Sequence, residues 1–141
     1  MKTRFVSGTG LVLAMVFAAV GALFLFSPEW VLRGMNGFAR TLGICESPLH
    51  GPGYFPVMAA SYMAVVTILA WRMFRDPQDP ANPLLLSQAK AASALFSLGV
   101  FFVHKPYFIL LANGILDGGI ALAAHAIYRD ARSRRAQGRI T

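Results

Sequence analysis

The chain has 141 residues, of which 56% are hydrophobic and only 13% are charged, and its mean hydropathy is +0.55. A soluble domain carries about 25% charged residues, so this composition excludes an ordinary water-soluble enzyme. The length allows a single domain. Four membrane helices of about 20 residues each would leave only termini and short loops outside the membrane.

Four long segments of the chain contain few or no charges, and they cover residues 5–27, 54–73, 83–103 and 106–128. Each is long enough to cross a hydrocarbon core about 30 Å thick. In lipid, only a helix satisfies the hydrogen bonds of such a backbone within the segment itself. We therefore predict an all-α integral membrane protein, a four-transmembrane-helix bundle with a single membrane domain over residues 1–141. The first segment follows basic residues, as in a signal peptide, but its apolar run is longer than a typical signal sequence.

A shorter helix of a different kind is predicted over residues 28–43. Ser27 and Pro28 form a helix-start signal, and Gly43 can end the helix. Between them, apolar residues that include Trp30 gather on one side, and polar residues lie largely on the other. This pattern predicts an amphipathic helix that lies in the outer membrane interface, with Trp30 as its anchor.

Positive charges are distributed unequally among the loops. If the N-terminus is inside, nine Lys and Arg residues lie on the inner side and three on the outer side, while Lys90 lies within a span. The positive-inside rule then predicts that both termini are cytoplasmic, and we expect the membrane to be the bacterial cytoplasmic (inner) membrane. The basic tail over residues 129–141 is interpreted as an anchor on anionic headgroups, not as a segment that binds nucleic acid.

Rows of small residues occur on two of the spans. In the first span, small residues recur at a spacing of four: Gly10, Ala14, Ala18 and Ala22. In the fourth span, Gly114 and Gly118 form a GxxxG motif. Small side chains let helices approach closely, and close contact drives helix association in lipid. The rows predict packing within the bundle, with contacts to other subunits as the alternative.

Two charged residues lie inside the predicted spans. Asp117 is about 15 Å from either end of its span, and Lys90 is about 9 Å from the inner end of the neighbouring antiparallel helix. An isolated carboxylate at this depth costs several kcal/mol, and a lysine stem can reach across the remaining vertical gap of about 6–7 Å. We predict a buried Lys90–Asp117 ion pair. In the alternatives, Lys90 alone reaches the inner headgroups, and Asp117 makes a structural hydrogen bond to another helix.

Further polar side chains share helix faces with this pair. Asn113 and Tyr128 lie on the Asp117 face of the fourth span, and Ser97 lies on the Lys90 face of the third. Together they predict a narrow polar seam. Such a seam could line a path for protons or a quinone headgroup, or it could serve only to hold the helices together.

Three histidines are candidates for a cofactor or metal site. His50 and His104 lie at the predicted outer edge, with Cys45 and Glu46 nearby, whereas His125 lies near the inner edge. Histidine pairs bind haem iron and metals, so haem or (bacterio)chlorophyll ligation is one hypothesis, and histidines bonded to loops are the other. We expect no cofactor, with haem, a quinone or (bacterio)chlorophyll as alternatives. The chain has no P-loop, HExxH motif, paired CxxC motif or nucleophile elbow.

In size and number of spans, the chain resembles the small four-helix bacterial membrane proteins of the DoxX-like kind, some of which are tied to quinol oxidation. The resemblance is one of layout and assigns no residue. The leading prediction is a small non-catalytic accessory or structural subunit of a larger membrane complex, in particular an energy-converting (respiratory or photosynthetic) one. Its partners would be the lipid bilayer and other membrane subunits. The alternatives are a DoxX-like redox protein that handles a quinone or haem, and a small transporter or proton-conducting protein.

Overall fold

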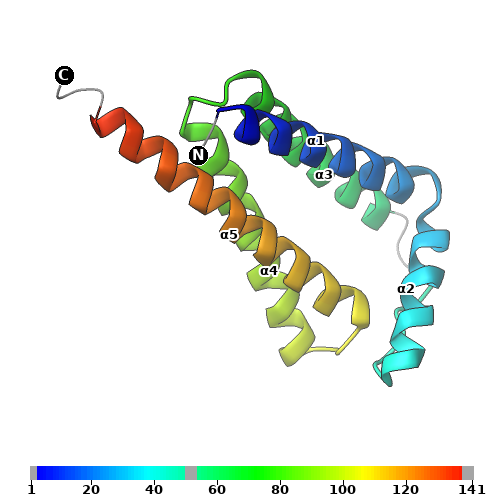
Figure 1. Cartoon of the computed structure of the whole chain (residues 1–141). Helices are drawn as coiled ribbons and strands as arrows, with labels where there is room; N and C mark the ends of the chain where they lie inside the picture. Colours follow the sequence, from blue (N-terminus) through cyan, green and yellow to red (C-terminus); the bar gives the residue numbers. More distant parts are fainter. Residues whose placement is uncertain (1–2, 50–53, 138–141) are drawn as a thin grey trace.

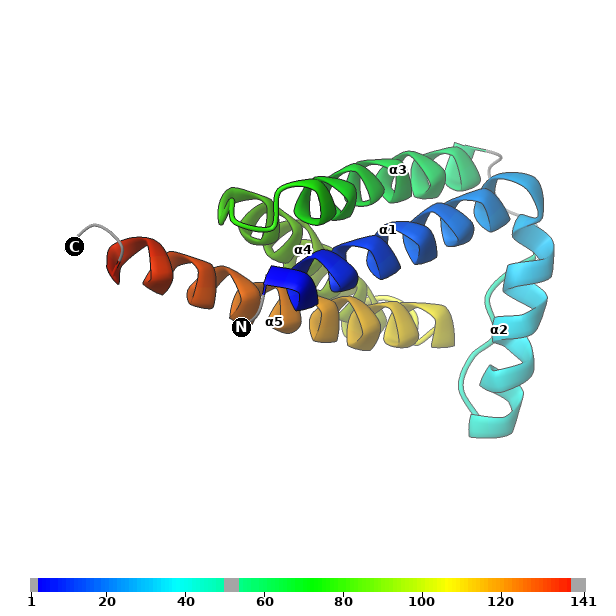
Figure 2. The same cartoon turned by 45° about the horizontal axis from the view of Figure 1, so that its top comes forward.

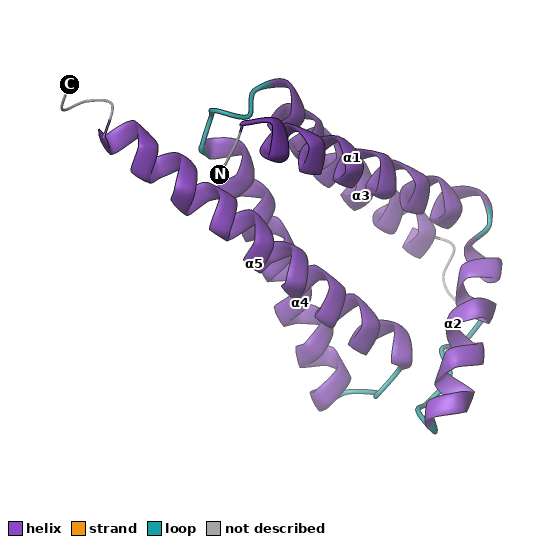
Figure 3. Cartoon of the chain, viewed as in Figure 1, coloured by secondary structure: helices purple, strands orange, loops and turns teal. Residues whose placement is uncertain are grey.

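The chain folds into five α-helices (Figure 1), which are α1 (Thr3–Phe26), α2 (Pro28–Leu42), α3 (Tyr54–Arg75), α4 (Ala81–Val103) and α5 (Phe108–Gln137). This computed structural model describes residues 3–49 and 54–137, and over those residues no strand forms (Figure 3). All the helices except α2 are long and apolar enough to cross a membrane. The predicted all-α fold with four apolar helices is therefore confirmed.

The last helix extends further than the sequence analysis predicted. α5 continues to Gln137, whereas the predicted span ended at residue 128 and was followed by a basic tail. The added turns contain neither proline nor glycine, and Arg134 pairs with Asp130 at i,i+4 spacing. Such pairs favour the helix. The basic segment as far as Gln137 is thus a helical extension of α5, and residues 138–141 lie outside the described residues.

The four long helices form two antiparallel pairs, α1 with α3 and α4 with α5. The two pairs meet where α1 begins and α3 connects to α4, and they diverge towards the opposite end of the molecule (Figure 2). α2 runs across this wide end and contacts α1 and α5. The main core lies where the pairs converge, and its buried residues come from all four long helices: Ala14, Phe17, Val66, Ala70, Leu86 and Ala124.

Glycines set the separation within each helix pair. A Cβ atom at Gly10 would lie only 2.7 Å from the backbone nitrogen of Phe74, so α1 packs directly on the backbone of α3. A Cβ atom at Gly114 would lie 2.6 Å from Cγ of Leu98 on α4. One at Gly118 would also face α4. Both glycines of the predicted GxxxG motif therefore lie in the α4–α5 contact.

The row of small residues predicted on the first span packs within the chain over only half its length. Gly10 and Ala14 are buried, but Ala18 and Ala22 are exposed, so the prediction of internal packing is wrong for these two alanines. The reason is that a step of four residues overshoots a full helical turn by about 40°, so the row drifts around the helix. Gly21, about two turns after Ala14, returns to the contact face and is buried.

Candidate functional site

Lys90 and Asp117 form an ion pair between α4 and α5. The Lys90 Nζ atom donates a hydrogen bond to Oδ1 of Asp117 at 2.7 Å, and the two side chains are only 1% and 5% exposed. The predicted pair is present, and the alternative in which Lys90 alone reaches the headgroups is wrong. Gly114, about one turn from Asp117, brings the two helices close enough for the lysine to reach the carboxylate.

Two aromatic rings from the other helix pair cover the ammonium group of Lys90. Its Nζ atom is 4.5 Å from the ring centroid of Phe17 on α1 and 5.0 Å from that of Tyr62 on α3. The faces of aromatic rings attract cations. Side chains from all four long helices therefore meet around this charge.

The sequence analysis did not place Tyr62 and Phe17 at this site. The Tyr62 hydroxyl donates a hydrogen bond to the carbonyl oxygen of Ala89 at 3.0 Å, which joins α3 to α4. A tyrosine within an apolar span could have indicated a polar contact, because a buried tyrosine hydroxyl usually has a hydrogen-bond partner. Phe17 carries no such signal, since phenylalanines are frequent along the spans.

Neutral polar side chains bond across the same α4–α5 contact. The Asn113 side-chain amide donates to Oγ of Ser97 at 2.7 Å and to Oγ of Ser93 at 3.2 Å. The Ser87 hydroxyl donates to the carbonyl oxygen of Ala121 at 2.9 Å. These bonds extend from one side of the ion pair to the other. The polar groups of the seam thus serve, at a minimum, to bind α4 to α5.

Tyr128 lies apart from this seam, although it was predicted to belong to it. Its hydroxyl accepts a hydrogen bond from Arg132. It lies three turns beyond Asp117, which is about 16 Å along the helix axis. Sharing a helix face does not bring it to the ion pair, because this distance along the axis separates the two side chains.

One oxygen of the ion pair has no partner within the described residues. Oδ2 of Asp117 is buried and accepts no hydrogen bond from any of them. Buried polar atoms are usually bonded, and an unbonded one carries a desolvation penalty. At this atom the site could therefore accept a proton or one further hydrogen-bond donor.

The described histidines do not form a common site. His104 and His125 are both exposed, and they lie towards opposite ends of the α4–α5 pair, about 25 Å apart along the axis of α5. His50 lies outside the described residues. Over residues 3–49 and 54–137, no group of three His, Cys, Asp and Glu side chains could hold a metal ion. His104 and His125 therefore cannot share a single ligand.

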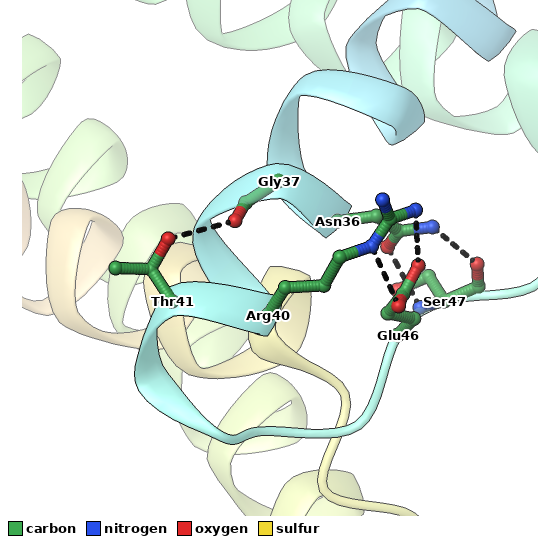
Figure 4. A network of polar contacts seen from close by, with 6 residues as sticks. All are labelled: Asn36, Gly37, Arg40, Thr41, Glu46 and Ser47. Atoms are coloured by element: carbon green, nitrogen blue, oxygen red, sulfur yellow. Dashed lines mark hydrogen bonds and ion pairs between the residues drawn. The ribbon is translucent and has the colours of Figure 1, made fainter.

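A second polar network holds the segment that follows α2 (Figure 4). The side-chain amide of Asn36 donates to the carbonyl oxygen of Ser47, and the Ser47 N–H group donates to Oδ1 of Asn36, both at 2.8 Å. Arg40 donates to both carboxylate oxygens of Glu46 at 2.8 and 3.0 Å. This hydrogen-bonded pair raises the pKa of Arg40 and lowers the pKa of Glu46. The sequence analysis did not anticipate the role of Asn36.

The same segment joins α2 to α5. The Phe108 N–H group donates to the carbonyl oxygen of Cys45 at 3.3 Å. The ring of Phe38 on α2 stacks near that of Phe108, with centroids 6.3 Å apart. α2 is thereby attached to the first turn of α5 at the wide end of the molecule.

Taken together, these features define a helical protein with four helices apolar enough to span a membrane, whose buried charges lie between its two helix pairs. Comparison with protein-family models, curated proteins and solved structures found no match for the chain.

Proposed function

We propose that this chain is a small non-catalytic subunit of a larger membrane complex. In this chain, the Lys90–Asp117 pair and the rings of Phe17 and Tyr62 hold the two helix pairs together. One observation carries the proposal, namely that side chains from all four long helices enclose the ion pair. A catalytic or substrate-binding role requires an approach to the charged atoms, whereas both side chains are at most 5% exposed. The pair is better placed to hold helices together than to react.

The outward faces of the helices support a role in assembly. Each long helix exposes large apolar side chains, among them Phe5, Ile68, Leu95 and Leu122. Lipid chains or the helices of neighbouring subunits can cover such a surface. Ala18 and Ala22, which are exposed on α1, would let a neighbouring helix approach closely.

We further propose an orientation with both termini on the cytoplasmic side of a bacterial inner membrane. The unequal distribution of Lys and Arg residues between the two ends of the helices supports it. On the outer side, α2 would then lie in the interface as an amphipathic helix. Its exposed Trp30, Phe38 and Leu42 side chains would contact lipid, with Trp30 as the anchor.

Native electrophoresis tests the subunit proposal. The protein is extracted from its own membrane in mild detergent, and the proteins that migrate with it are identified by mass spectrometry. We expect one large complex with a fixed stoichiometry. Migration of the chain alone, near its own size plus detergent, would contradict the proposal.

A pair of matched variants tests which surface makes the contact. Ala18→Leu adds bulk to the uncovered row of small residues, so we expect it to release the chain from the complex. Ala19→Leu makes the same change on the same helix, at a neighbouring exposed position outside that row. It should leave the complex intact. Equal effects of the two variants would exclude the row as the contact surface.

A second candidate function, proton conduction or transport, is favoured by the unpartnered Oδ2 atom of Asp117. If this carboxylate carries protons, liposomes that contain the protein should show proton flux, and Asp117→Asn should abolish it. The subunit proposal predicts no flux through the isolated wild-type chain. The two candidates are therefore separated by the wild-type measurement alone.

A further inference from the structure

We propose that the end of the molecule where the two helix pairs meet binds the phosphate of an anionic phospholipid headgroup. A cavity of about 320 Å³ lies there, between the start of α1, the α3–α4 connection and the helical extension of α5. It is lined by Val6, Pro77, Gln78, Ala131, Arg134 and Arg135. This proposal is independent of the subunit role.

The charge around the cavity favours an anionic ligand. Two of its six lining residues are arginines and none is acidic. The chain segments that form this end carry seven described arginines and three aspartates: Arg4, Arg72, Arg75, Arg129, Arg132, Arg134 and Arg135, and Asp76, Asp79 and Asp130. The excess of arginines over aspartates attracts anionic headgroups, and one headgroup can bind in the cavity.

Arg134 and Arg135, the two arginines that line the cavity, contact neighbouring residues but keep further N–H donors for a ligand. Arg135 donates to the carbonyl oxygen of Gln78 at 3.1 Å and lies 3.5 Å from Oδ1 of Asp79. Arg134 pairs with Asp130. Each guanidinium group has five N–H donors, and the side chains of Arg134 and Arg135 are 44% and 58% exposed. Both can therefore donate to phosphate oxygens, an acceptor that suits the planar guanidinium fork.

The position and size of the cavity favour a lipid headgroup over a free phosphate compound. The cavity lies at the ends of membrane-spanning helices, where lipid headgroups gather, and Val6 gives it an apolar wall. Its volume is at the lower end of the range of about 300–1,000 Å³ that is typical of ligand pockets. It can hold a headgroup but not a whole lipid. The acyl chains would continue along the apolar outer surface of the helices.

Native mass spectrometry of the full chain from nanodiscs tests the proposal, with phosphatidylglycerol and phosphatidylcholine as the probe lipids. We expect the wild-type chain to retain one phosphatidylglycerol molecule and no phosphatidylcholine. Arg134→Gln/Arg135→Gln should weaken this retention at least about tenfold, because charge-assisted bonds to phosphate are lost. The control, Arg129→Gln/Arg132→Gln, removes equal charge from the same helix outside the cavity and should retain the lipid.

A second variant tests whether binding requires the space of the cavity as well as its positive charge. Ala131→Trp fills the cavity without changing any charge, so it should also lose the bound lipid while its helix content, measured by circular dichroism, stays unchanged. Equal losses in both double arginine variants would overturn the proposal in favour of general surface attraction. Equal retention of phosphatidylcholine would overturn it as well. Displacement of the lipid by inorganic phosphate at matched concentration would identify a free-phosphate site instead.

Discussion

Lys90 places an ammonium group among side chains from four helices, with only 1% of its side chain exposed. A lone charge at such a depth costs several kcal/mol in lipid. The carboxylate of Asp117 and the rings of Phe17 and Tyr62 offset that cost. Removal of one partner leaves an uncompensated buried charge, whereas removal of both leaves two neutral side chains of similar volume. The stability effects of the two residues should therefore depend on each other.

Asp117→Asn should lower the free energy of unfolding by about 3–5 kcal/mol, because it leaves the Lys90 ammonium group without its counter-charge. The double variant Lys90→Met/Asp117→Asn should recover most of that loss. Reversible unfolding in mixed detergent micelles, followed by circular dichroism, gives both values. A double variant as unstable as Asp117→Asn would show that the pairing itself does not stabilise the fold.

The exposed pair Glu29–Arg33 on α2 is the matched control for this experiment. Its atoms lie 3.5 Å apart, and its side chains are 54% and 66% exposed. Exposed pairs contribute about 0–1 kcal/mol, because water and salt screen them. Glu29→Gln should therefore change the free energy of unfolding far less than Asp117→Asn does.

At the scale of the elements, the contact within the α1–α3 pair and the contact within the α4–α5 pair depend on different interactions. Backbone proximity dominates between α1 and α3, where Gly10 faces the backbone of Phe74 and the Ser7 hydroxyl donates to the Phe74 carbonyl oxygen at 3.0 Å. Side-chain hydrogen bonds dominate between α4 and α5, including those of Asn113. The first contact should therefore be sensitive to added volume and the second to lost polarity.

Gly10→Ala should destabilise the protein by about 1–3 kcal/mol, as is typical of overpacking. The added Cβ atom would meet Phe74 N at 2.7 Å and Ala70 O at 2.9 Å, and these backbone atoms cannot move aside without separating the helices. Gly8→Ala is the control on the same helix, since a Cβ atom there meets nothing within 4 Å. It should be neutral or slightly stabilising, because alanine favours a helix over glycine. Similar unfolding midpoints for the two variants would contradict the close packing of α1 on α3.

For the whole molecule, the two ends differ in chemistry. The wide end carries α2 (Figure 2). It also carries Cys45, the single cysteine of the chain, which is exposed and whose carbonyl oxygen accepts a hydrogen bond from the Phe108 N–H group. The opposite end carries the arginine-rich extension of α5 and the cavity. This separation makes the proposed orientation open to a direct test.

A membrane-impermeant maleimide should label Cys45 in intact cells, because the proposed orientation places the wide end outside. The variant Cys45→Ser/Arg132→Cys moves the thiol to the opposite end and should react only after the membrane is permeabilised. The variant Cys45→Ser alone supplies the background. The opposite labelling pattern would reverse the orientation, and labelling of both sites from outside would contradict a membrane-spanning arrangement.

The sequence by itself determined the helical class, the four apolar helices and the central ion pair. Uncharged stretches of this length have to be helical in lipid, and depth along a helix can be counted at a constant rise per residue. The contact between Lys90 and Asp117 could therefore be predicted from their depths on adjacent helices. The end of α2 was predicted for an equally local reason, since Gly43 adopts the left-handed conformation with φ of 66°.

Only the tertiary structure decided that α1 pairs with α3 and which residues surround the charges. The placement of Phe17 and Tyr62 over Lys90 and the exposure of Ala18 depend on how each helix is rotated about its axis. Local sequence does not determine that rotation here, because the apolar residues extend around each helix and lipid covers one apolar face as readily as another. Contacts between segments far apart in the chain select the rotation.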